Sequence, residues 1–415
     1  MKWFGGGGSA PEPAEANDEG EHRMTQQFAE RATNVAPTGA RNADLSDLIR
    51  ILEDGQRRKL DVIAPASALR MREGNVHVEG VESLITEDGV TDVDGIYRPT
   101  ALADEGISEK LRIPLAYLRR MRAENVPLLD ENVNAWLGER PERRFMLRAF
   151  RGENGPGMPP AEGVARALLS DSYKLMDNLD MLLAALDGVQ KSGHPTRITG
   201  CDLTDRRMYV RVESEAVAVQ ARSLLRGYRS PFDGRSGDEL PMISAGFVIT
   251  NSEVGDGAYT ITPRAVIQVC RNGLTETKDV MRAVHYGGRQ DQGVVSWSGQ
   301  TQRKTLELIT SKTTDAVRTF LSQDYVEAKV HEMEAAAGKT LDEPTKTIEH
   351  VTKTLSIGNE AKDMILAHFV RGGQMMAGGV MQAVTSTAQT LTDADQAAAL
   401  EALAVPALMA AAAHG

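Results

Sequence analysis

Basic side chains alternate with tyrosines in the middle of the chain, a combination suited to binding nucleic acid. Over residues 207–212 the strand period of two puts positions 207, 209 and 211 on one exposed face. Guanidinium groups would contact phosphates, and tyrosine rings would stack on bases, as single-strand binding requires. The candidate nucleic-acid-binding residues come from this strand, the Arg- and Gly-rich loop 222–239, a strand near 143 and the segment 170–174. They are Arg144, Arg148, Lys174, Arg207, Tyr209, Arg211, Arg222, Arg226, Tyr228 and Arg229.

The charge distribution places any nucleic-acid surface in this same region. The net charge of −11 argues against a chain that is basic over its whole surface. Residues 140–230 reverse the sign, with 15 basic and 11 acidic side chains. The alternative is an ordinary solvated strand and loop, because runs of charge commonly just face water.

A second possible chemistry is nucleophilic catalysis by Cys270 with His285. A thiolate–imidazolium pair would support a hydrolase or a transferase. The alternative is a buried cysteine acting as a small core hydrophobe. The sequence contains no CxxC or HxxxH spacing, no GxxxxGK[ST] loop and no dinucleotide fingerprint, so no metal site and no cofactor are expected.

Residues 242–288 have the pattern of two strands joined by a polar, Gly-rich turn. Ile243, Ala245, Phe247 and Ile249 share one face of the first strand. The polar group Asn251, Ser252, Asn272 and Gly273 would either satisfy backbone amides in turns or form a ledge for a ligand. Turn chemistry is the favoured interpretation.

The whole pattern predicts an α+β fold with a central, mostly antiparallel sheet, flanking helices and a helical C-terminal region. The expected divisions are a disordered tail at 1–42, an α+β N-terminal region at 43–140, a sheet-rich core at 141–300 and helices at 301–415. Two cysteines, no apolar run of membrane-spanning length and no secretory signal favour a cytoplasmic protein without membrane contact.

Three segments resemble the phage- and plasmid-associated proteins grouped as domain-of-unknown-function family 932. They are LLSDSYKLMDN (168–178), TNSEVGDGAYTITPRAVIQVCRNGL with the following VHYGG, and GGVMQAVTSTAQ (378–389). Glu253 and Val254 stand where many relatives have a His-Asp pair. The positions that match the family motifs are Asp171, Tyr173, Asn178, Asn251, Ser252, Gly255, Gly257, Pro263, Val269, Cys270, Asn272 and His285.

The resemblance implies a mobile-element context and a link to DNA metabolism, without an established activity. At fold level only, the pattern is also similar to single-strand annealing proteins, which pair a twisted sheet with long helices and often form rings. The leading hypothesis is therefore a non-catalytic protein that binds single-stranded DNA and promotes annealing or recombination, assembling through its C-terminal helices. The alternatives are the Cys/His-centred enzyme and a structural or interaction module.

Overall fold

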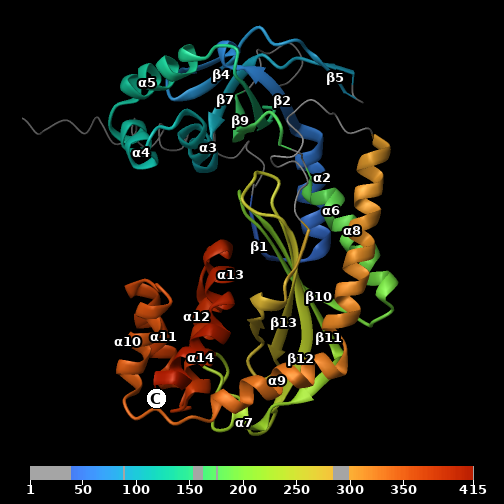
Figure 1. Cartoon of the computed structure of the whole chain (residues 1–415), viewed down its shortest axis with the longest axis vertical. Helices are drawn as coiled ribbons and strands as arrows, with labels where there is room; N and C mark the ends of the chain where they lie inside the picture. The colour runs from blue at the N-terminus through green and yellow to red at the C-terminus, as the bar shows by residue number, and fades with distance from the viewer. Residues whose placement is uncertain (1–38, 87–88, 153–161, 174–175, 284–298, 415) are drawn as a thin grey trace, which may run out of the picture. The chain divides into compact units, whose positions relative to one another are not determined.

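The computed structural model describes residues 39–86, 89–152, 162–173, 176–283 and 299–414. Two large sheets, each with its own set of helices, make up most of the described chain (Figure 1). Nearly all of the strand pairs are antiparallel, and a helical region follows the last strand, so the α+β prediction is confirmed.

The larger sheet, sheet A, has seven strands in the order β1-β10-β11-β12-β13-β14, with β15 also pairing β13. All of its pairs are antiparallel. The strands are β1 (Ala40–Ala43), β10 (Arg197–Leu203), β11 (Met208–Gln220), β12 (Met242–Asn251), β13 (Tyr259–Ile267), β14 (Asn272–Thr275) and β15 (Met281–Ala283). Strand β1 begins inside the expected tail 1–42, so that prediction is wrong for residues 40–42.

The β12–β13 hairpin follows the pattern of its sequence. Ile243, Phe247 and Ile249 are fully buried on one face of β12. At the turn, Ser252 Oγ accepts hydrogen bonds from the backbone N–H groups of Val254 (3.4 Å) and Asp256 (3.0 Å). Gly255 adopts φ +85°, which a glycine reaches without steric cost. The turn interpretation is thus confirmed for Ser252.

The second sheet, sheet B, has the order β2-β8-β9-β7-β4-β3, in which only β7 and β9 run parallel among its described pairs. Its strands are β2 (Lys59–Pro65), β3 (Leu69–Arg72), β4 (Asn75–Val78), β7 (Gly95–Pro99), β8 (Arg144–Phe150) and β9 (Gly163–Ser170); β5 (Leu84–Thr86) and β6 (Gly89–Thr91) form a separate pair. Sheet B therefore takes strands from both sides of residue 140, and the expected division there does not separate the two sheets.

Each sheet has its own hydrophobic core. Sheet B buries its apolar side chains with α3 (Ala101–Leu111), α4 (Leu115–Glu124) and α5 (Val126–Glu139). Sheet A shares its core with the remaining helices: α2 (Leu45–Arg58), α6 (Asn178–Ser192), α7 (Arg222–Leu225), α8 (Gly299–Phe320), α9 (Gln323–Ala337), α10 (Pro344–Thr354), α11 (Asn359–Gly372), α12 (Ala377–Thr390), α13 (Ala394–Ala402) and α14 (Ala404–His414). Figure 1 shows α6 and α8 on one side of sheet A and α12 and α13 on the other.

Among the described residues, every helix taken singly is too short or too polar to span a membrane, and α13 and α14 have the necessary length and apolarity only when counted together as one bent pair.

Candidate functional site

A cleft of about 780 Å³ lies on the face of sheet A that α13 covers. Its walls carry two acidic side chains, Glu213 and Glu401, and α13 contributes mainly alanines, at 397–399 and 402. Among the described residues, Asn42, Tyr209 and Gln389 also line it, and the rest of its polar lining is seven arginines and six threonines: Arg41, Arg197, Arg207, Arg211, Arg264, Arg271, Arg282, Thr199, Thr250, Thr260, Thr262, Thr275 and Thr277.

Strand register arranges these residues in rows across the sheet. Tyr209 pairs with Thr250, Thr250 with Thr260, and Thr260 with Arg282. Neighbouring strands lie about 4.8 Å apart, so this row spans about 14 Å. Two residues further along, on the same face, the next row contains Arg211 and Thr262. The cleft floor thus presents hydroxyl and guanidinium groups in rows, with Val248 between Arg211 and Thr262.

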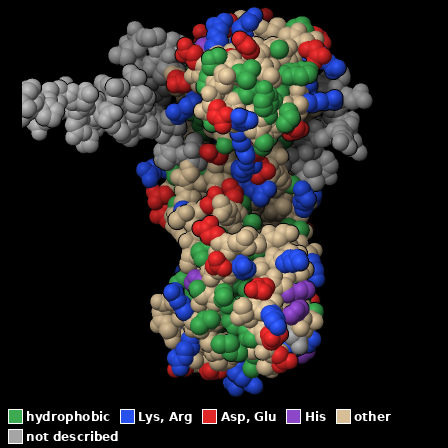
Figure 2. Space-filling model, turned by 90° about the vertical axis from the view of Figure 1, so that its left-hand side faces the viewer, with side chains coloured by type: hydrophobic (Ala, Val, Ile, Leu, Met, Phe, Trp, Pro, Cys, Tyr) green, Lys and Arg blue, Asp and Glu red, His purple; other side chains and the backbone are tan. Residues whose placement is uncertain are grey.

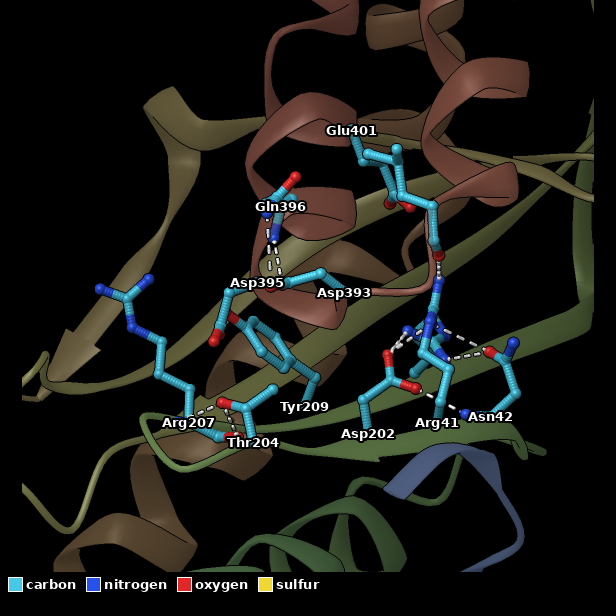
Figure 3. A network of polar contacts seen from close by, with 12 residues as sticks. Arg41, Asn42, Asp202, Thr204, Arg207, Tyr209, Asp393, Asp395, Gln396 and Glu401 are labelled. Atoms are coloured by element: carbon cyan, nitrogen blue, oxygen red, sulfur yellow. Dashed lines mark hydrogen bonds and ion pairs between the residues drawn. The ribbon is translucent and has the colours of Figure 1, made fainter. Parts of the chain in front are cut away.

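Carboxylates hold several of the cleft arginines in place, with one acid serving two arginines. Asp202, which is 2% exposed, accepts a hydrogen bond from Arg41 Nη1 at 2.8 Å and another from Arg211 (Figure 3). Burial alone would raise the pKa of Asp202, but the bonds from Arg211 and Arg41 and from the Asn42 backbone lower it. The carboxylate therefore stays ionised and orients both guanidinium groups.

At two other places along the cleft, acidic side chains also contact two arginines each. Asp256 lies 3.3 Å from Arg207 and 3.7 Å from Arg206. At the other end, Arg197 and Arg271 both lie within 4 Å of Glu213 and Glu215. The Arg197 and Arg271 side chains remain 56% exposed, so their guanidinium groups stay accessible to a ligand.

Gly273 allows Arg264 its position in the cleft. A Cβ at residue 273 would lie 2.0 Å from Arg264 Nη2, so the guanidinium group occupies the space that a side chain would fill. Arg264 makes a two-point contact with Glu401 of α13, at 2.7 and 3.3 Å. Gly273, which the sequence pattern assigned to a turn, thus leaves the space that the Arg264 side chain occupies.

The structure separates the ten predicted nucleic-acid-binding residues. Three of them, Arg207, Tyr209 and Arg211, line the cleft together. The exposed Arg222, Arg226 and Arg229 follow the end of β11 at Gln220, the opposite end from Tyr209, and they do not line the cleft. Arg144 is exposed on sheet B, and Lys174 lies outside the described residues.

The expected stacking role of the tyrosines is not supported by their burial. Tyr228 is 2% exposed and lies in the core, where its hydroxyl meets Ser386 Oγ at 3.4 Å, so the prediction that it contacts nucleic acid is wrong. Tyr209 reaches the cleft but is 5% exposed, and its hydroxyl donates to Asp395 Oδ1 at 2.8 Å. A core residue cannot offer its ring to a base.

Arg148 is also wrongly predicted as a contact residue, because it is 1% exposed and bound inside the protein. Its guanidinium group donates to the Glu253 backbone carbonyl at 2.9 Å, pairs with Asp177 and lies 3.3 Å from Asp61. The alternation that places it on a basic face of β8 is correct, but that face is covered. Its role is structural.

Glu253 joins the two sheets at this point. Its carboxylate accepts hydrogen bonds from Arg166 of β9 (2.8 Å) and from the Asn178 N–H at the start of α6 (2.7 Å). Burial acts to raise the pKa of Glu253, and the cations Arg166 and Arg148 outweigh it and lower the pKa. Glu253 thus forms part of a buried ion network.

The three segments that carry the family resemblance contact one another. Asn251 Nδ2 donates to Asn178 Oδ1 at 2.8 Å, and Asn272 Nδ2 donates to Ser386 Oγ at 2.9 Å. Asn251 and Asn272 are fully buried, so neither forms an open ledge for a ligand. Tyr173 lies beside Gly255, and Asp171 is exposed. These motif residues connect elements of the fold.

Cys270 has the surroundings of a core residue. It is 5% exposed, and burial raises the pKa of its thiol to about 11. A nucleophilic cysteine needs its pKa lowered instead. His285 lies outside the described residues. Within the described ranges, no group of three or more His, Cys, Asp and Glu side chains is placed to hold a metal ion.

This burial predicts slow reaction of both thiols. Cys201 is also buried, with its pKa raised to about 11. We expect a disulfide reagent at pH 8 to label neither cysteine in the folded protein, and to label both in denaturant, as followed by absorbance. Rapid labelling of Cys270 in the folded protein would restore it as a candidate nucleophile.

Sequence reasoning did not find most of the cleft. Five of its arginines come from four strands and the β13–β14 corner, and only the register places them together: Arg41, Arg197, Arg264, Arg271 and Arg282. The alternation of Thr260, Thr262 and Arg264 was the available signal.

The view in Figure 2 shows basic and acidic side chains intermixed on one face of the molecule, without a broad basic patch there. Comparisons of this chain with protein-family models, with curated proteins and with solved structures find no match.

Proposed function

We propose that the cleft of sheet A binds single-stranded DNA through its phosphates. The observation that carries the proposal is the lining of seven arginines and six threonines around a space of about 780 Å³. Arginine pairs with phosphate oxygens through two parallel hydrogen bonds, and threonine hydroxyls donate to the same oxygens. The resemblance to mobile-element proteins extends the proposal to annealing or recombination.

Phosphate contacts, rather than base stacking, would supply the affinity. Among the described residues that line the cleft, Tyr209 is the one tyrosine, and its ring is nearly covered. Binding of this kind is largely independent of sequence and falls steeply with salt. The cleft volume is in the range of about 300–1,000 Å³ that small-ligand pockets have. A short length of single strand therefore suits it better than a duplex.

Two matched triple variants test the cleft directly. One changes Arg197, Arg271 and Arg282 to Gln, removing three cations from the cleft. The other changes Arg222, Arg226 and Arg229 to Gln, removing the same charge from an exposed surface outside the cleft. Affinity for a fluorescent oligothymidylate is measured by anisotropy across a salt series.

The cleft variant should bind about tenfold or more weakly at low salt, and its salt slope should fall by about two. The surface variant should keep both values near those of the unmodified protein. A duplex of equal length should compete poorly. Equal losses in both variants would contradict the cleft as the site, and undetectable binding by the unmodified protein at low salt would refute the proposed function.

A further inference from the structure

We propose that α13 is a displaceable roof that closes the cleft, with the carboxylates of Asp395 and Glu401 occupying positions that ligand phosphates take. The roof is defined here as residues 394–402. The identity of the ligand rests on the function proposed above, whereas the closing of the cleft by α13 rests on the contacts described next.

Two acidic side chains of the roof contact the polar floor of the cleft. Glu401 accepts two hydrogen bonds from Arg264, at 2.7 and 3.3 Å, as a phosphate would. Asp395 accepts a hydrogen bond from the Tyr209 hydroxyl at 2.8 Å. Figure 3 shows Asp395 and Glu401 on the side of α13 that faces the sheet. The free protein thus carries its own anions at the site.

The roof makes little apolar contact with the cleft floor. The residues that it turns to the cleft, apart from Glu401, are Ala397, Ala398, Ala399 and Ala402. Leu400, its largest apolar side chain, is buried in the core of sheet A. Opening the cleft therefore breaks the polar contacts of Asp395 and Glu401 and also exposes Leu400, whose burial is the main apolar contribution that holds the roof in place.

The neighbours of the roof are anchored more firmly. Helix α12 is buried along nearly its whole length, and α14 buries Val405 and Leu408. The axis bends by 40° between α13 and α14, and the extended Leu391 ends α12. At that end Arg41 adds a weak bond to the Leu391 carbonyl, at 3.4 Å. The roof is therefore a separate nine-residue unit between two fixed helices.

A polyanion would open the roof by competition. The ligand that binds Arg264 and Tyr209 must replace the two carboxylates, and the population of the open state then follows the differential affinity. A single inorganic phosphate can replace only one of the two carboxylates, Asp395 or Glu401. A phosphodiester chain has several phosphates and can replace both. The roof would thus favour chains over free phosphate.

Hydrogen exchange tests the roof without any ligand. Tyr209→Phe removes one contact from the sheet side and leaves the sequence of α13 unchanged, and Asp395→Asn/Glu401→Gln removes both carboxylates. The matched control is Glu360→Gln/Asp363→Asn, which removes the same charge from exposed positions on α11. Amides of residues 394–402 should exchange faster in the first two proteins and at the unmodified rate in the control.

Binding of oligothymidylate gives the second readout. The Asp395→Asn/Glu401→Gln protein should bind about tenfold more tightly than the control, a difference of about 1.4 kcal/mol, because the ligand no longer has to displace the two carboxylates. Adding oligothymidylate to the unmodified protein should accelerate amide exchange in the roof. If the two acids acted only through their charge, without the roof opening, exchange would stay unchanged or become slower.

The outcomes separate the two proposals. Unchanged roof exchange in Tyr209→Phe and in the carboxylate variant would overturn the roof, whatever the protein binds. Faster exchange with no oligothymidylate binding by any protein would support a releasable helix and refute single-stranded DNA as its ligand. Faster exchange with binding no tighter than in the control would overturn the blocking role.

Discussion

Replacing Arg148 with Met is expected to lower the free energy of unfolding by about 3–5 kcal/mol, the usual cost of removing one partner from a buried ion pair. The substitution would leave the Asp61 and Asp177 carboxylates and the Glu253 carbonyl without their shared cation. Arg148 is 1% exposed, so water cannot take the place of its guanidinium group unless the contact between the two sheets opens. Urea unfolding followed by circular dichroism measures the loss.

Asp61→Asn is the matched variant from the other end of the same ion pair. Burial, partly offset by Arg148, raises the pKa of Asp61, so its ionised form is disfavoured in the fold. Arg148 keeps Asp177 as its partner, and the loss should stay below about 1 kcal/mol. Equal losses in the two variants, or no loss in Arg148→Met, would contradict the structural role assigned to Arg148.

The pH dependence of stability provides a further check on this network. The pKa values of Asp177 and Glu253 are lowered because the nearby cations outweigh burial. Groups of this kind stabilise the fold above their unfolded pKa values, 3.8 and 4.5, and lose that contribution as the pH falls. Arg148→Met should therefore flatten the decline of stability below about pH 4.5.

Local periodicity predicted the strands well, because alternation needs only neighbouring residues. The strand expected at Met242 begins there, and Ile243, Phe247 and Ile249 are buried as expected. The same rule placed Arg148 on a polar face of its strand. It could not show that this face is covered by Glu253, which is 105 residues away in sequence. Burial by distant segments is not visible in a local pattern.

The candidate site shows the same limit. Arg207 and Arg211 were found because they alternate on one strand, but Arg264 and Arg282 join them only through the register of β13 with β12 and β15. Tyr228 was assigned to a surface loop from its Arg- and Gly-rich neighbours, yet its ring packs into the core. Composition identifies a polar segment, while tertiary packing decides which of its side chains reach solvent.

The role of Asn251 can be tested by an isosteric change, Asn251→Asp, which is expected to destabilise the protein by about 3 kcal/mol. The Asn251 amide donates to the Met176 carbonyl (3.1 Å) and to Asn178 Oδ1 (2.8 Å), and it is fully buried. A carboxylate would face those two acceptors without a proton to donate. Rotation of the Asn178 amide can relieve one clash, but the Met176 carbonyl cannot change its polarity.

Asn272→Asp is the informative comparison for this change, because Ser386 presents a hydroxyl that can turn to donate to the new carboxylate. Its cost should be the smaller of the two, although it too buries a charge. Thermal unfolding measures the stability of both variants, and oligothymidylate binding is measured on the fraction that remains folded. Together they separate a structural role of Asn251 from a role in ligand binding. If Asn251→Asp kept its unfolding free energy and lost only binding, Asn251 would belong to a binding site, and the connection that it makes between β12 and α6 would be incidental to the fold.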